Sequence, residues 1–149
     1  MATFSVDNTA RTPFGKNAFL RSTQDVKTES YTVSAANFPA NVTVDGEAKK
    51  VLQPGTVMAT ITAVGAEQGK IGPFDAAATD GRQTGANIVG LAETFVPWQL
   101  AERDVDIAVV YECTAVAAWC LHHDTDVQEA MDGTTQTAVE TAVPTINFK

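Results

Sequence analysis

The stretch "DIAVVYECTAVAAWCL", residues 106–121, is the most apolar part of the chain and decides between a helical and a β-rich fold. Its alanines are compatible with a helix. Its valine, tyrosine, cysteine and threonine content disfavours one and is typical of strands. The sequence therefore predicts either one long strand here or a hairpin bent near Thr114.

Shorter extended segments precede this run, and turn residues separate them. Val57, Ala59 and Ile61 alternate with polar or flexible residues, which is the pattern of a half-buried strand. Gly90, inside another apolar run, indicates a bulge or a close backbone approach. Pro54-Gly55 is a strong turn signal. The predicted strands or turns lie within residues 31–39, 41–46, 56–65, 69–74 and 86–96, and residues 96–106 hold at most one helical turn.

The C-terminal part carries the one helix signal in the sequence. Thr125 and Gln128 have the spacing of a capping box, and Gly133 resembles a helix stop. We therefore predict a short helix from Asp126 to Asp132, followed by extended segments over residues 135–148. With so many short strands and turns, the fold class is predicted to be all-β or mostly β.

Residues 1–30 differ from the rest of the chain. They show no sustained period of 2 or 3.6, are rich in threonine, serine and asparagine, and contain three phenylalanines in the first nineteen residues. We interpret them as an extended N-terminal arm whose apolar side chains dock on the body or on a partner; a plain disordered tail is the alternative. The domain assignment is thus an arm over 1–30 and a β-rich domain over 31–149.

Length and charge limit the classes of function. A chain of 149 residues fits one domain that folds without a metal or a disulfide. No apolar stretch is long enough for a membrane span, and the N-terminus has no apolar core of a signal peptide, which predicts synthesis in a cytoplasm. The net charge of −8 is concentrated after residue 100, whereas residues 1–50 are slightly basic. This balance argues against nucleic-acid binding.

Motifs for nucleotide chemistry and acid–base chemistry are weak. Residues 65–71, "GAEQGKI", superficially resemble a phosphate-binding loop, but the glycine spacing is one residue short and Ile71 stands where a hydroxyl is needed. Glu102, Asp104 and Asp106 are close in sequence, as carboxylates on acidic surfaces often are. Asp75 and Asp80 flank a small-residue loop without the ligand spacing of a calcium loop. We expect no enzyme activity and no cofactor.

Four potential zinc ligands lie within eleven residues: Cys113, Cys120, His122 and His123. Adjacent histidines in a strand point apart and rarely reach one ion, so we expect no metal site. The same geometry would place the two cysteines on opposite faces of one continuous strand. The cysteines are therefore interpreted as buried structural residues.

Two tryptophans are candidates for different roles. Trp119 lies within the apolar run and is predicted to be part of the core. Trp98 follows Pro97 in a polar turn and is the better candidate for a contact surface, because interfaces favour tryptophan as an anchor. A lid over the domain's own core is the alternative for Trp98.

Three segments together resemble the head decoration proteins, or capsid cement proteins, of lambda-type phages. Residues 78–96, "ATDGRQTGANIVGLAETFV", resemble the part of that family in which an Asp/Gly turn leads into a strand. Residues 54–62, "PGTVMATIT", look like an earlier strand of the family, and residues 106–118, "DIAVVYECTAVAA", are similar to its late apolar strand. The match covers residues 54–121, under half of the chain, and rests on order and spacing.

The resemblance implies a small β-barrel or β-tulip-like body with an extended N-terminal arm; the predicted short C-terminal helix lies outside the matched residues. It implies a homotrimer on the outer capsid surface of a virion, where it bridges neighbouring capsomers, with the major capsid protein as partner and no role for nucleic acid or membrane. The expected contact residues are Phe4, Arg11, Phe14, Phe19 and Leu20 in the arm, and Trp98.

Other functions stay open at this point. Another virion part, such as a capsid spike or a tail component, belongs to the same broad class. A β-sandwich carbohydrate-binding module is a third reading. An enzyme of the trimeric dUTPase type has a similar size, but its ordered Asp, Ser, Arg and Tyr motifs are not found in this chain.

Overall fold

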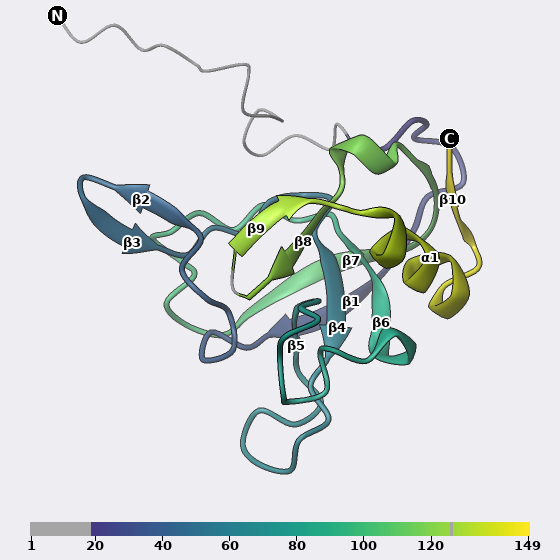
Figure 1. The fold of residues 1–149 in the computed structure, drawn as a ribbon. Helices are drawn as coiled ribbons and strands as arrows, with labels where there is room; N and C mark the ends of the chain where they lie inside the picture. Colours follow the sequence, from purple (N-terminus) through teal and green to yellow (C-terminus); the bar gives the residue numbers. More distant parts are fainter. Residues whose placement is uncertain (1–18, 126) are drawn as a thin grey trace, which may run out of the picture.

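A computed structural model describes residues 19–125 and 127–149. Five strands of this chain form a closed β-barrel (Figure 1). The predicted all-β class and the barrel are confirmed. Around the barrel the strands follow one another in the order β1-β5-β4-β6-β7, and β1 pairs with β7 to close the ring. These strands are β1 (Lys27–Val33), β4 (Val57–Thr60), β5 (Ile71–Pro73), β6 (Ile88–Ala92) and β7 (Val105–Ala115).

Strand β7 organises the fold. It pairs with β1 on one edge and with β6 on the other, both antiparallel. Beyond the residues that pair with β6, the C-terminal part of β7 pairs in parallel with β10 (Ile146–Phe148), so that Ile146 lies opposite Cys113. The predicted long strand is therefore correct as far as Ala115, and no hairpin folds back at Thr114.

Beyond β7 the chain turns through the 3₁₀ helix η3 (Ala117–Trp119) into a two-stranded ribbon. This β8–β9 ribbon consists of β8 (Leu121–Asp124), Thr125 and β9 (Val127–Ala130). A second hairpin, β2 (Val42–Val44) with β3 (Glu47–Lys49), turns at Asp45-Gly46, both with positive φ, and projects from the body in Figure 1.

The barrel wall is buried on both of its faces where β4, β6 and β7 meet. Val57 and Ala59 of β4 point to an outer core, whereas Met58 points into the barrel, and all three are fully buried. The predicted half-buried strand is thus buried on both sides, because a second layer covers its outer face. The barrel interior contains one or more residues from every strand: Val33, Met58, Ile71, Ala92, Ile107 and Val109.

The second layer consists of α1 (Gly133–Ala142), β10 and the residues around β8. Figure 1 shows α1 beside β6 and β10. The outer core between this layer and the wall includes Phe19, Leu91, Val110, Cys120, Val139 and Ile146.

The predicted bulge at Gly90 is present. The register between β4 and β6 shifts between Met58 and Ala59, opposite Gly90. Gly90 has φ +148°, and a Cβ at this position would lie 2.1 Å from the carbonyl oxygen of Val110. Only glycine allows the two backbones to approach this closely.

The predicted C-terminal helix is wrong in position. Residues 127–130 form β9, and Thr125, with φ +52°, occupies the turn of the β8–β9 ribbon instead of capping a helix. The helix starts at Gly133, with Asp132 as the N-cap that accepts a hydrogen bond from Thr135 N at 2.7 Å. Residues predicted to be extended therefore form α1, and only their end, β10, is a strand.

The arm assigned to residues 1–30 is too long, because Lys27–Val33 form a barrel strand. Phe19 is fully buried in the outer core, so its assignment as a capsid contact is corrected to a core residue. Leu20 is partly buried and bridges to Ala115. Phe4, Arg11 and Phe14 lie outside the described residues.

Both ends of the described chain flank the last residues of β7. Val116 N donates to Phe19 O at 2.8 Å, and Lys149 N donates to Ala115 O at 3.0 Å. Within the described residues, no helix is long and apolar enough to cross a membrane.

Candidate functional site

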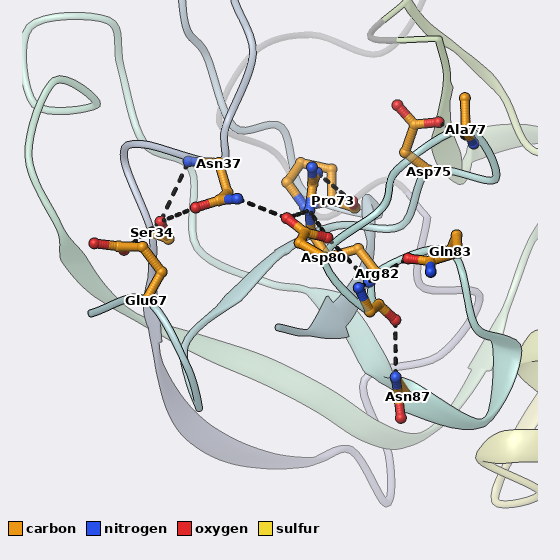
Figure 2. Close-up of polar contacts among 11 residues, drawn as sticks. Ser34, Asn37, Glu67, Pro73, Asp75, Ala77, Asp80, Arg82, Gln83 and Asn87 are labelled. Atoms are coloured by element: carbon orange, nitrogen blue, oxygen red, sulfur yellow. Dashed lines mark hydrogen bonds and ion pairs between the residues drawn. The ribbon is translucent and has the colours of Figure 1, made fainter. Parts of the chain in front are cut away.

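The loop that joins β5 to β6 contains the small-residue stretch that Asp75 and Asp80 flank. Its central group is Arg82, which is almost fully buried and lies against Asp80 with Nε 2.9 Å from Oδ2 (Figure 2). Arg82 Nη1 also donates to the carbonyl oxygen of Pro73 at 3.1 Å. Asn87 Nδ2 donates to Gly81 O, which ties the end of the loop to its middle.

Asp80 connects this loop to the rest of the barrel end. It accepts a hydrogen bond from Asn37 Nδ2 at 2.6 Å, and its backbone oxygen accepts from Thr62 N and Ala63 N. Burial alone raises the pKa of Asp80, but hydrogen bonds and charge from Arg82 outweigh it and hold the pKa below its ordinary value. Gly81 is required here, because a Cβ would lie 2.1 Å from Thr62 Oγ1 and its φ is +107°.

The polar contacts continue from Asn37 to the turn between β4 and β5. Ser34 Oγ donates to Asn37 Oδ1 at 3.0 Å and reaches Glu67 Oε2 at 2.5 Å, as Figure 2 shows. Lys70 then lies between Glu67 and Asp104 at 3.1 and 2.6 Å. Hydrogen bonds to Asp104 and Glu67 raise the pKa of Lys70, so its amino group is charged.

These contacts assign the network a structural role. The lysine of the sequence at 65–71 is bound by two carboxylates, and this segment leads from strand β4 to its antiparallel neighbour β5. Asp75 at the start of the next loop accepts hydrogen bonds from Ala77 N and Thr125 N. The polar groups named in this network bond to one another, which holds three loops together at one end of the barrel.

In contrast to this polar network, the indole of Trp119 is an apolar group exposed on the surface. The prediction that Trp119 belongs to the core is wrong: it is 40% exposed in the 3₁₀ turn after β7. The turn itself is anchored beneath, because Val116 N donates to Phe19 O and Leu121 N donates to Gly55 O. A large aromatic side chain is therefore presented on a rigid support close to Phe19, the residue to which residues 1–18 are attached.

Trp98, the predicted contact residue, is half-buried. Lys49 of the β2–β3 hairpin places its Nζ 5.2 Å from the centre of the Trp98 ring, a cation–π geometry. Lys49 also pairs with Glu47 at 2.8 Å. The contact holds the projecting hairpin against the turn at 97–102, so Trp98 is an intramolecular support that stays partly exposed.

The histidines and cysteines do not converge on one point. His122 faces α1, with Nδ1 2.8 Å from Thr135 Oγ1 and Nε2 2.9 Å from Glu129 Oε1. His123 lies on the other side of β8 with its ring 6.3 Å from that of Phe38. Within the described residues no group of three or more acidic, histidine or cysteine side chains is arranged to hold a metal ion.

Both thiols are buried and unpaired in the outer core, as the sequence analysis expected of structural cysteines. Burial raises the pKa of Cys113 to about 11. Burial and the neighbouring Cys113 raise the pKa of Cys120 to about 12. At neutral pH both are protonated, and a protonated thiol is neither a strong nucleophile nor a metal ligand.

The sequence analysis missed two features, the burial of Arg82 and the exposure of Trp119. The buried Arg82 gave only a faint signal, an arginine directly after an Asp-Gly turn. The exposure of Trp119 gave none, because the surrounding residues are apolar and the turn after Ala115 was not predicted.

Comparison with known proteins adds no relative to this picture. No protein-family model matches the chain, and neither the curated proteins nor the solved structures contain a match to it.

Proposed function

We propose that this chain is a capsid decoration protein, which binds the outside of an expanded phage head and stabilises it by bridging neighbouring capsomers. It acts by burying surface and not by catalysing a reaction. On this proposal the partner is the major capsid protein, the protein binds as a homotrimer, and its location is the outer surface of the virion.

The resemblance on which the proposal rests maps onto connected parts of one barrel. Its three segments are the turn and strand β4, the Asp80 loop with β6, and β7. In the barrel β4 pairs with β6 and β6 pairs with β7, so the segments that carry the likeness form one continuous wall.

The observation that carries the proposal is the anchoring of Phe19 beneath the Trp119 turn. Phe19 is fully buried and Arg21 N donates to Thr114 O at 2.9 Å, so the chain leaves the barrel from a fixed point. Residues 1–18, which include Phe4, Arg11 and Phe14, are attached at this point. A strap that binds a larger subunit needs a rigid attachment, because motion at its base weakens the linkage between its contacts and those of the body.

The test is occupancy of expanded phage heads, measured by co-sedimentation over a range of protein concentrations. Deletion of residues 1–18 stops short of Phe19 and keeps this core residue in place, so a loss of binding by a folded variant reports on contacts of residues 1–18. We expect affinity to fall tenfold or more. Trp119→Ala is expected to weaken binding by a similar factor, because truncation of an interface tryptophan typically costs 2 kcal/mol or more.

Leu100→Ala is the matched control, since Leu100 is 42% exposed, close to the 40% of Trp119, but lies in the turn at 97–102. It should bind as the full chain does. Capsid occupancy unchanged by both the deletion and Trp119→Ala would contradict the proposal, and so would steady turnover of a nucleotide substrate by the purified protein. Mass measurement of the particle-bound protein tests the trimer.

A further inference from the structure

Polar contacts fasten the β8–β9 ribbon to the barrel and to the segment before β2, where Asn41 Nδ2 donates to Gln128 Oε1 of β9 at 2.7 Å. Leu121 N donates to Gly55 O at 3.0 Å and His123 N donates to Phe74 O at 3.1 Å. At the tip of the ribbon, Thr125 N donates to Asp75 Oδ1 at 3.2 Å. On the barrel side these three acceptors lie just before β4 and just after its antiparallel neighbour β5, so they lie along one line of attachment.

The side chain of His123 lies beneath this attachment. It is 1% exposed, and within the described residues neither ring nitrogen has a hydrogen-bond partner. Its ring packs against that of Phe38, which belongs to the barrel interior. A neutral imidazole without hydrogen bonds already costs free energy in such a place, and a charged one costs much more. Burial accordingly lowers the pKa of His123 to about 4.

The charged groups that face His123 come from three directions. Asp75, at the end of β5, favours the protonated ring, whereas Arg82 from the loop and His122 from the same strand disfavour it. Asp75 already accepts hydrogen bonds from Ala77 N and Thr125 N, and Arg82 is held by Asp80. The balance of these groups leaves burial as the dominant effect.

We propose that the β8–β9 ribbon is an acid-sensitive latch: protonation of His123 releases the ribbon from the barrel, and the barrel itself stays folded. The barrel ring closes through β1, β4, β5, β6 and β7, none of which belongs to the ribbon. Opening brings His123 into water, where its pKa returns to about 6.5. Because the folded pKa is depressed, the latch is fully closed above pH 6.5 and weakens as the pH falls toward 4. The proposal is independent of the proposed function.

Amide hydrogen exchange of the full chain, followed residue by residue and corrected for intrinsic rates, tests the latch. Between pH 7 and pH 4.5, the opening constant at the amides of Leu121 and His123 should rise about 60-fold, from the two pKa values. The amides of Met58 and Ala92, in the barrel wall, should keep their protection. The His123 ring nitrogens, observed by ¹⁵N NMR, should stay neutral at pH 5.5.

Two variants complete the test. In His123→Phe the opening constant of the ribbon should be the same at both pH values, because no imidazole is left to protonate. His122→Gln, a change at the adjacent histidine, should keep the rise of the opening constant in acid. The latch is overturned if Met58 and Ala92 lose protection by the same factor as the ribbon, because His123 would then govern global unfolding. It is equally overturned if His123→Phe keeps the response, or if the wild-type ring titrates near pH 6.5, a measurement that does not depend on the folding of any variant.

Discussion

Single residues in this protein are constrained most where two backbones meet. At Gly90 a side chain would collide with the carbonyl oxygen of Val110 and would also have to adopt φ +148°. Gly90→Ala is therefore expected to destabilise the fold by about 3 kcal/mol or more, through a backbone clash that a flexible side chain cannot relieve. Urea unfolding followed by circular dichroism measures the loss.

Gly133→Ala is the matched control for this change. Gly133 is the first residue of α1, and a Cβ there meets nothing within 4 Å. Alanine is a better helix former than glycine, so the variant should be as stable as the wild type or slightly more stable. Equal losses in the two variants would contradict the account of the bulge.

The buried guanidinium of Arg82 is the cation that pairs with the carboxylate of Asp80. Arg82→Met leaves the carboxylate of Asp80 partly buried without its cation, which typically costs 3–5 kcal/mol. Arg103→Met, a change at an exposed arginine, should be neutral within about 0.5 kcal/mol. Chemical unfolding at pH 7 separates the two outcomes.

The same ion pair gives a pH dependence with a defined sign. Because the folded-state pKa of Asp80 is lowered, its contribution to stability is present above the unfolded pKa of about 3.9 and is lost as the pH falls below it. The difference in stability between the wild type and Arg82→Met should therefore narrow below pH 4. A difference that stays constant from pH 7 to pH 3 would show that Arg82 acts through packing alone.

At the scale of elements, α1 depends on its cap and its packing more than on its composition. Four of its ten residues are threonines, which are weak helix formers, and two of them bond back to carbonyls one turn earlier. Asp132→Ala removes the acceptor for Thr135 N and should cost about 1 kcal/mol. Asp132→Asn, which keeps an N-cap oxygen, should lose much less, and thermal unfolding compares the two.

The elements that the sequence predicted are those whose signal is local. The β4 alternation, the Pro54-Gly55 turn, the bulge at Gly90 and the apolar run of β7 were all recognisable because each pattern lies within one element. The β8–β9 ribbon and α1 were not, because the deciding contacts come from elsewhere. Thr125 and Gln128 match a capping box, yet Thr125 binds Asp75 and Gln128 binds Asn41.

The candidate contact surface was predicted only in part, for the same reason. Aromatic residues near the N-terminus and Trp98 were recognisable from their sequence context, but their exposure is set by tertiary packing. Phe19 is enclosed by the outer core, and Trp119 is turned outward by the 3₁₀ helix after Ala115. The Arg82 network joins segments 34–37, 62–70 and 73–87, which no local pattern connects.

For the molecule as a whole, the two cores share the strands that separate them. Loss of the outer layer removes the cover from Val57 and Ala59, and loss of the barrel interior releases Met58 between them. We therefore expect a single cooperative unfolding transition at pH 7. Trp119 reports on the outer layer and Trp98 on the turn over the barrel interior, so the single-tryptophan variants Trp98→Phe and Trp119→Phe provide separate probes.

In each variant, the urea unfolding curve followed by tryptophan fluorescence should give the same free energy of unfolding and the same slope as the curve followed by circular dichroism. Fluorescence midpoints that differ from the circular dichroism midpoint in either variant would mean that the layers unfold separately, which the shared wall argues against.

The placement of Phe19 and Lys149 on either side of Ala115 and Val116 has a practical consequence for anyone who attaches cargo to this protein. A peptide, dye or enzyme attached at Lys149 starts at the same pole of the barrel as Phe19 and the turn that carries the exposed Trp119, so it competes for space with any partner that binds there. Cargo inserted at the Asp45-Gly46 tip of the β2–β3 hairpin is joined to a projection of the body instead, and leaves that pole unobstructed.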